Sequence, residues 1–407
     1  MRAAHGPRIN APRVGEANIL SGLSYFEHPF TRALLVATRL RRLRVECIEV
    51  NPDSPLSEQG LAPFKGRLLA HSVSFSLFDP DFDVPGWLRS ARRNLRGYPL
   101  RFISVHFGLS HLNNRKLDTF LPCWPSSRDL AVATDRLRRL SDEFGCPVGM
   151  ENLALALSRD DVYWQMDSLR ELMERGNAYL LLDLHNVFCQ AVNFEFDYQQ
   201  LIGFYPLDRV LELHTSGGSD DWVAVSADAA SSSRGDEASQ LFRRDTHDGR
   251  VPEAILNVLP WVVRQCPELQ WVIFERLPCT SVREVLKASS DYAALLGKLP
   301  TGKVPGRTFA IESERCQIEG PGAGREGPSG GRPQVPVRPW DNSILIPYLS
   351  DLGSGKRENA FQQRELGVQA DSRAIEVCGK LIRRWQRECS TSQLGHPAEA
   401  LWREERT

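Results

Sequence analysis

The sequence lacks three features that would define other classes of protein. Its 407 residues contain no run of about 18 apolar residues, so no segment is predicted to cross a bilayer. Nine cysteines occur without C-x-x-C pairs or regular spacing, which argues against a zinc ribbon or disulfide framework and favours reduced thiols in the cytoplasm. A formal net charge of −1 is too small for a protein whose main task is to coat nucleic acid or an anionic membrane.

What is present is the composition of an ordinary soluble protein, with 42% hydrophobic and 25% charged residues. The chain is long enough for one large domain and an additional segment. Residues 1–17 are basic but lack the apolar core of a secretory signal, and we expect them to be flexible.

Eight short apolar runs recur through the first three quarters of the chain. They are 18–26, 43–50, 67–75, 101–108, 146–153, 179–187, 209–217 and 270–277, and amphipathic stretches follow most of them at 31–43, 84–95, 127–145, 160–176, 251–265 and 281–299. Near-continuous apolar runs are typical of strands buried on both faces. The alternation predicts an α/β fold, a (β/α)8 TIM barrel over residues 18–299. A doubly wound sheet is the alternative, but no Gly-rich turn follows the first run.

The last quarter has a different character. Residues 316–334 are rich in Gly and Pro, which predicts a linker. Residues 300–407 as a whole are therefore expected to be a linker and a largely disordered C-terminal extension, with one possible amphipathic helix at about 366–390.

Ionisable side chains close six successive predicted strands, where a parallel barrel carries its functional residues. In chain order they are His71, His106, Glu151 with Asn152, Asp183 with His185 and Asn186, His214, then Asp245 and His247 in the next loop, and Glu275. A single such residue is more simply explained as a buried group with one or two hydrogen bonds. Burying so many around one barrel mouth is costly unless cations neutralise the carboxylates.

The donor set indicates which cations these are. Imidazole and carboxylate suit zinc, iron or manganese, and the lack of cysteine at the strand ends argues against an iron–sulfur cluster. The set exceeds the roughly four protein ligands that one tetrahedral ion uses, so two or three ions are predicted.

The remaining histidines have simpler interpretations. His28 follows the first strand and is a candidate neighbour of the ligands, whereas His5, His111 and His396 are expected at the surface. If the sixth strand runs to residue 187, Asn186 faces the pocket and His185 points away.

At this point the segments AHSVSFSL, SVHFG, MENLA, LLLDLHNVFCQAVNFEFD, VLELH, DTHDGRVP and FER resemble, in order, the multinuclear non-heme iron-dependent oxidative enzymes, formerly a bacterial family of unknown function. The resemblance covers about residues 18–280. Its most specific part is LLLDLHNV followed by Asn193 and Asp197. It implies a barrel like those of xylose isomerase and endonuclease IV.

The resemblance implies an enzyme that binds two or three iron ions (Fe2+/Fe3+), uses dioxygen as co-substrate and modifies a ribosomally made precursor peptide, most often at cysteine. It also implies a small partner protein that binds the leader of the peptide. The implied ligands are His71, His106, Glu151, Asp183, His214, Asp245, His247 and Glu275, with Asn186 as a possible ligand. Of these, His71, Asp183, His214 and Asp245 are expected to act in catalysis.

Two features depart from the family. The family usually has Asn where this chain has His185, and SGLSYFEHP has fewer glycines around the first strand. The polar loop 216–242 is predicted to be either a lid over the mouth or plain surface.

Two other enzyme classes use a similar ligand pattern. An endonuclease IV-like trinuclear zinc phosphodiesterase would need a basic surface with interleaved aromatic residues, whereas the arginine clusters at 41–44, 91–96 and 136–140 fall on predicted outer helices. A sugar isomerase or epimerase would use a catalytic lysine or a carboxylate pair with one or two divalent ions, and no predicted strand ends in lysine. An inactive metal- or peptide-binding scaffold is disfavoured by the complete ligand set.

Overall fold

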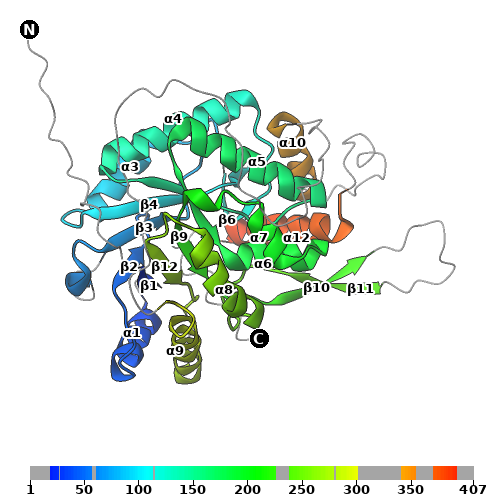
Figure 1. Ribbon diagram of the computed structural model, residues 1–407. Helices are drawn as coiled ribbons and strands as arrows, with labels where there is room; N and C mark the ends of the chain where they lie inside the picture. The colour runs from blue at the N-terminus through cyan, green and yellow to red at the C-terminus, as the bar shows by residue number, and fades with distance from the viewer. Residues whose placement is uncertain are drawn as a thin grey trace, which may run out of the picture.

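Eight strands form a closed barrel at the centre of the protein (Figure 1). The computed structural model describes residues 19–26, 28–56, 61–112, 115–225, 238–278, 281–300, 341–353 and 370–391. The barrel strands are β1 (Leu20–Tyr25), β2 (Cys47–Val50), β3 (Leu68–Ser72), β4 (Leu100–His106), β7 (Val148–Glu151), β8 (Tyr179–Asp183), β9 (Val210–Thr215) and β12 (Trp271–Phe274). Their order around the barrel is β1-β12-β9-β8-β7-β4-β3-β2, and every pairing is parallel. The predicted (β/α)8 TIM barrel is confirmed.

Helices surround the barrel where the sequence is amphipathic. They are α1 (Pro29–Leu40), α3 (Val84–Asn94), α4 (Ser127–Phe144), α5 (Arg159–Gly176), α8 (Glu253–Gln265) and α9 (Val282–Leu296), with short helices η1 (Ala62–Phe64) and η2 (Leu207–Arg209). The sequence marks both ends of α4. Ser126 and Asp129 form a capping box at its N-terminus, and Gly145 ends it in the left-handed conformation. Arg136, in a cluster predicted to be solvated, is instead buried and donates to the carbonyl of Ser76 (2.8 Å).

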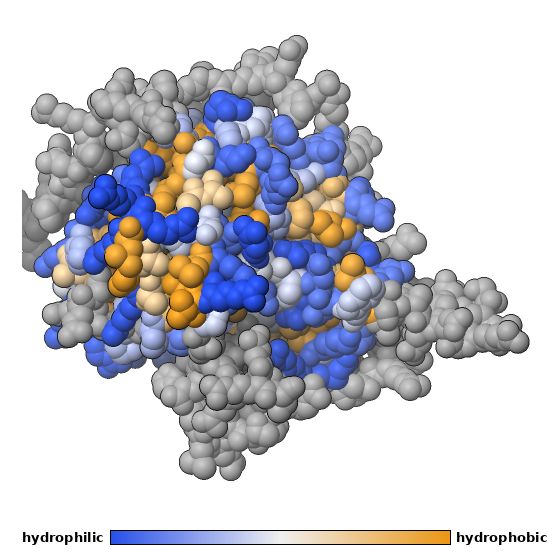
Figure 2. All heavy atoms as spheres, turned by 90° about the horizontal axis from the view of Figure 1, so that it is seen from below, coloured by the Kyte–Doolittle hydropathy of each residue, from blue (hydrophilic) through white to orange (hydrophobic). Residues whose placement is uncertain are grey.

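Helices α1 and α9 pack together at the end of the molecule drawn at the bottom of Figure 1. They expose Val36, Leu40, Val282 and Leu286, two residues four apart on each helix. Figure 2 views this end from below and shows apolar side chains gathered among hydrophilic ones. None of the described helices is both long enough and apolar enough to span a membrane.

The sixth predicted strand is wrong beyond residue 183. Strand β8 ends at Asp183, and α6 (Leu184–Phe194) and α7 (Tyr198–Gly203) follow. The Asp183 carboxylate caps α6 by accepting from the backbone N–H groups of His185 (2.6 Å) and Asn186 (2.8 Å). The apolar run LLLDLHNVF crosses from strand to helix without a change of period, so the pattern does not mark the boundary.

Two hairpins extend the strand-to-helix connections. Strands β5 (Leu109–Leu112) and β6 (Arg115–Leu121) follow β4, and β10 (Asp220–Val225) and β11 (Ala238–Arg243) follow β9. The second hairpin includes both arms of the loop predicted at 216–242 and projects from the barrel in Figure 1. Residues 226–237 lie outside the described residues, so the lid stays a prediction.

Two helices of the tail pack against the barrel. Helix α12 (Ser372–Thr391) lies in the stretch where one helix is predicted, and α10 (Asn342–Gly353) was not predicted. Leu345, Leu349, Ile375 and Cys378 of these helices are buried. The predicted flexible N-terminus at 1–17 and the predicted linker at 316–334 lie outside the described residues.

Candidate metal centre

Strand register brings the ionisable residues together. His106 on β4 is paired with Glu151 on β7, and Asp183 on β8 is paired with His214 on β9. Because parallel strands end at the same rim of the barrel, their last residues converge there. The predicted residues form three overlapping groups. His214 also belongs to a further group, with Glu49 and Glu212, two carboxylates that the sequence analysis did not single out.

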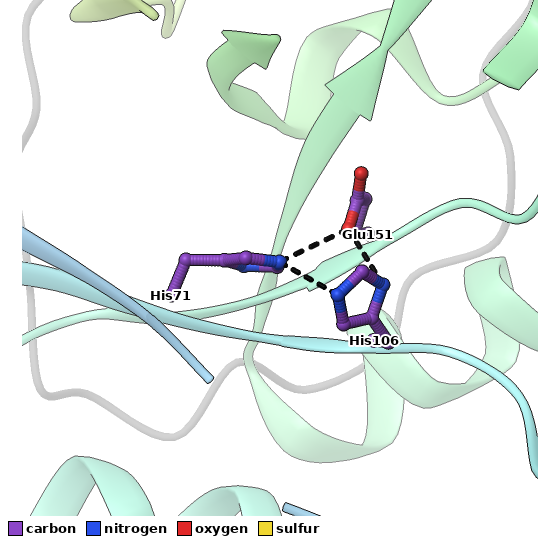
Figure 3. Close-up of side chains that lie close together, drawn as sticks. All are labelled: His71, His106 and Glu151. Carbon is purple, nitrogen blue, oxygen red and sulfur yellow. Dashed lines mark hydrogen bonds and ion pairs between the residues drawn. The ribbon is translucent and has the colours of Figure 1, made fainter. Parts of the chain in front are cut away.

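The first group contains His71, His106 and Glu151 (Figure 3). Glu151 Oε2 lies 3.2 Å from His71 Nε2 and 2.7 Å from His106 Nδ1. The two Nε2 atoms of the histidines are 2.8 Å apart. Ser104 Oγ contacts His71 Nδ1 (2.8 Å) and so leaves Nε2 to face the group. Two imidazoles and a carboxylate that converge in this way are arranged to bind a cation.

The second group contains Glu151, Asp183, His214 and Glu275, all of them buried. His214 Nδ1 lies 3.0 Å from Glu275 Oε2 and 4.0 Å from Glu151 Oε1. Since one oxygen of Asp183 caps α6, the other is free to act as a ligand. This group places three carboxylates around one imidazole.

The third group contains Asp183, Asp245 and His247. His247 Nε2 lies 2.9 Å from Asp245 Oδ1 and 3.5 Å from Glu275 Oε2. The backbone of His247 has a φ of 54°, which is uncommon for a non-glycine residue and is often found at functional sites. The loop after β11 thus contributes Asp245 and His247 to this group.

Glu151 belongs to the first and second groups, and Asp183 to the second and third. The structure thus brings all eight implied ligands into one continuous centre, in which the ligand atoms of each group lie within 4.8 Å of one another. Asn186 lies at its edge, where its Nδ2 donates to Glu151 Oε1 (3.3 Å) and to the carbonyl of Asn152 (2.8 Å).

Unpaired polar atoms test whether metal ions fit this centre. Among the described residues, buried side-chain atoms without a hydrogen-bond partner include Asp183 Oδ2 and Asn186 Oδ1 in this centre and Glu212 Oε2 next to it. Buried polar atoms are normally hydrogen-bonded, so a cluster of exceptions calls for an occupant. Cations bound between the three groups would supply the missing partners, and the residues fit them.

Electrostatics in the metal-free protein show the same need for positive charge. Burial, with Asp245 and Glu151 nearby, raises the pKa of Asp183 well above its ordinary value. Burial acts to lower the pKa of His71, but the bond to Glu151 outweighs it and raises that pKa to about 9. Burial also acts to lower the pKa of His214, and the neighbouring Glu275 and Glu49 raise it well above normal. Protons on these histidines take the place that cations would fill.

Two carboxylates beneath the centre escaped the sequence analysis. Glu49 Oε2 on β2 accepts from His214 Nε2 (2.9 Å), and Glu212 Oε1 on β9 lies 3.7 Å from the same nitrogen. Glu212 is fully buried, and burial with Glu49 nearby raises its pKa to about 7. The signal was present, since Glu212 and His214 are two apart on one strand and so share a face.

The other histidines are also placed. His185 lies in the first turn of α6, with Nδ1 2.7 Å from Asp245 Oδ1, so it belongs beside the third group and not away from the mouth as a continued strand would require. His28 Nδ1 accepts from the N–H of Phe30 and caps α1. His111 is half-buried on β5.

A small pocket of about 70 Å³ lies beside the first and third groups. Its apolar side includes Phe120, which stacks on the ring of His106 with centroids 3.6 Å apart, and Leu153. Its polar side includes Arg244 and Asp245. A substrate group in this pocket would reach two of the ligands directly.

Comparison with known sequences shows which protein family the chain belongs to. A family profile described as "RiPP precursor modification enzyme MbnB/TglH/ChrH" matches residues 35–288. A UPF0276 protein of Acinetobacter baylyi is 26% identical over 202 residues, which are 50% of this chain and 64% of the relative. A UPF0276 protein of Pseudomonas aeruginosa is 23% identical over 193 residues, 46% of this chain and 68% of the relative. The chain therefore spans about two thirds, or slightly less, of the curated relatives it matches.

Solved structures with a similar fold are more distant. A xylose isomerase-like TIM barrel protein from Mycobacterium smegmatis, in complex with magnesium, has a TM-score of 0.39 and 13% identity, covering 67% of this chain and 91% of its own. The 3-keto-D-glucoside 4-epimerase of E. coli has a TM-score of 0.39 and 11% identity, covering 69% and 99%. Likenesses this remote do not bear on function.

Proposed function

Because the chain belongs to the family of RiPP precursor modification enzymes, which act on ribosomally synthesised and post-translationally modified peptides, we propose that it is an iron-dependent, dioxygen-using enzyme that oxidises a cysteine of a precursor peptide. The observation that carries the proposal is the sharing of Glu151 and Asp183 between three adjacent ligand groups. Two shared carboxylates are what a centre of two or three neighbouring ions requires.

The donor set supports iron. Imidazole and carboxylate ligands with no cysteine suit ferrous and ferric ions, and ions of this kind supply one-electron chemistry and a site for dioxygen. The peptide cysteine would provide the electrons that dioxygen accepts. The protein's part is to hold the cysteine in the pocket beside His106 and Asp245 and to exclude water there.

The residues around the centre favour this proposal over hydrolysis. Among the residues that the structure describes, no lysine lines the pocket. Its apolar side of Phe120 and Leu153 suits a small side chain better than a phosphodiester. Arg244, which lines the pocket, is paired with Asp221 (2.8 Å), and this pairing reduces its ability to bind phosphate. The zinc phosphodiesterase remains the second candidate because it would use a similar ligand set.

The metal content of the purified protein tests the proposal. We expect iron, at two or three ions per chain, after purification without chelator, measured by inductively coupled plasma mass spectrometry. His214→Ala and Asp245→Ala should lower the iron content, and His111→Ala is the matched control outside the three groups. A colourless protein that carries stoichiometric zinc and cleaves a phosphodiester would contradict the proposal.

Substrate and partner require a second test. We propose that the peptide is encoded near this gene, together with a small protein that binds its leader. Co-expression should change the mass of the peptide, and replacing its cysteines with serine should abolish the change. An unmodified peptide in the presence of iron-loaded enzyme, candidate partner and dioxygen would count against this pair as substrate and partner.

A further inference from the structure

Helix α12 lies beyond the segment that the family profile matches and yet reaches the mouth of the barrel. The match ends at residue 288, and α12 begins at Ser372. It packs against hairpin strands β10, β11 and β6, which rise from the strand ends that carry the metal centre (Figure 1). The tail is therefore close to the site in space although it is far from it in sequence.

The helix is anchored to the barrel at its first turn. The backbone N–H of Asp371 donates to the carbonyl of Leu157 (2.7 Å), and Arg373 Nη2 donates to the carbonyl of Asn193 (2.6 Å). The first acceptor follows β7, which carries Glu151, and the second lies near the end of α6, which carries Asn186. The helix is thus tied to the rim by polar contacts as well as apolar ones.

One face of α12 is directed inward. Ala374, Val377 and Cys378 are buried, and the helical spacing continues this face to Leu381. Leu381 is half-buried and lines the same pocket as His106 and Asp245. A side chain of the C-terminal tail therefore shares a pocket with two metal ligands.

We propose that α12 covers the pocket, and that its residue Leu381 limits the size of the substrate group that can reach His106 and Asp245. Leu381, Phe120 and Leu155 contribute apolar lining to the pocket, whose other lining residues include Asn186 and Arg244. A short side chain on an extended peptide fits such a slot, and a bulky or aromatic one is excluded by Leu381. The identity of that side chain as cysteine rests on the proposed function, whereas the size limit does not.

A cysteine introduced into the pocket can test, without metal or substrate, whether α12 and Leu381 limit access to it. Thr119, on β6, also lines the pocket, and Thr119→Cys would place a thiol there. Alkylation by small iodoacetamide and by bulky N-phenylmaleimide would be followed on the metal-free protein. Fragment-ion mass spectrometry separates position 119 from Cys123, which is buried.

In this background, Leu381→Ala should speed labelling by the bulky reagent about threefold or more, because access limits thiol reactivity. Leu381→Trp should slow labelling by iodoacetamide by a similar factor. Leu381→Met preserves the volume and should leave both rates unchanged. Ile382→Ala is the control for a loosened helix, since Ile382 is buried and is not part of the pocket lining.

Unchanged rates in both Leu381→Ala and Leu381→Trp would overturn the proposal, as would an equal acceleration in Ile382→Ala. Circular dichroism of each variant checks that α12 stays folded, and Leu381→Trp provides the decision if Leu381→Ala unfolds. The result is independent of the proposed chemistry. A protein without iron can still show the size limit, and an active iron enzyme can fail to show it.

Discussion

Glu151 is the residue on which the first two ligand groups depend. Its two oxygens face different partners, with Oε2 toward His71 and His106 and Oε1 toward His214. Glu151→Gln preserves size and removes the charge that both groups share. We expect the variant to lose at least one metal ion per chain, measured by mass spectrometry of the metal content. Glu143→Gln is the control, since Glu143 pairs with Arg92 on the surface; equal metal content in both variants would refute the shared role.

Glu49 acts on the centre through another residue. By accepting from His214 Nε2 it fixes the proton there and leaves Nδ1 toward the second group. Glu49→Gln should weaken metal affinity about 10- to 100-fold, the usual effect of removing such a partner. Anaerobic titration of ferrous ion against a competing chelator measures it. Glu46→Gln is the control, because the Glu46 carboxylate accepts from the Ser21 backbone N–H and not from His214. Equal metal affinity in the Glu49 and Glu46 variants would contradict the role of Glu49.

The sequence analysis predicted the residues that converge in the three groups and missed Glu49 and Glu212 for one physical reason. His71, His106 and Glu275 each close an apolar run, so their position along the chain marks them. Glu49 lies inside its strand, within CIEV, where an ionisable residue looks like an isolated exception. Its function depends on pairing across the barrel with His214, a contact between residues far apart in sequence that no local pattern records.

At the level of elements, strand ends were predicted well where a turn interrupts the apolar run. The exception is the boundary between β8 and α6, where Leu182, Asp183 and Leu184 continue the run across it. The capping role of Asp183 was the available signal, because Asp before a helix is a common N-cap. That boundary decides the orientation of His185, which is why its place beside Asp245 was not predicted.

Helix α12 should unfold together with the barrel and not before it. Ile375→Ala removes a side chain that is buried against the core, and truncations of this kind cost about 2–5 kcal/mol. We expect the free energy of unfolding in urea to fall by such an amount in a single transition. Lys380→Ala, on the exposed face, should change it by less than about 0.5 kcal/mol. A separate early transition in the parent protein would show that the helix is only loosely attached.

For the whole molecule, the closed barrel followed from the alternation of apolar runs and amphipathic stretches, because parallel strands need helical crossovers. The hairpins were not predicted, since β5 and β6 interrupt a connection that the pattern treats as a loop. Helix α10 was not predicted either, because it contains Pro347 and its burial depends on contacts with α12. Local composition cannot reveal such packing.

Stability of the whole protein should respond to metal and pH together. The raised pKa of His71, about 9, means that its proton stabilises the metal-free fold at neutral pH and that this contribution is lost as pH rises toward that value. A metal ion needs the deprotonated nitrogen, so proton and ion compete. We expect the increase in Tm on adding cobalt(II), an oxygen-tolerant substitute, to grow from about pH 6 to about pH 9. A cobalt-induced increase in Tm that stays constant or shrinks as the pH rises would contradict the competition between proton and ion. In Glu151→Gln, the increase in Tm should depend less on pH.

Because α12 follows the barrel in the chain, the ribosome makes the residues of the three groups before it makes the helix that covers the pocket. All eight residues of the three groups precede residue 276, and α12 starts at Ser372, about a hundred residues later. A ribosome adding roughly 5–20 residues per second takes on the order of 5–20 s to cover that distance. During this interval a nascent barrel is exposed to surrounding ions through an uncovered mouth. The supply of metal ions during translation, and not only afterwards, would then determine how much of the finished protein carries them.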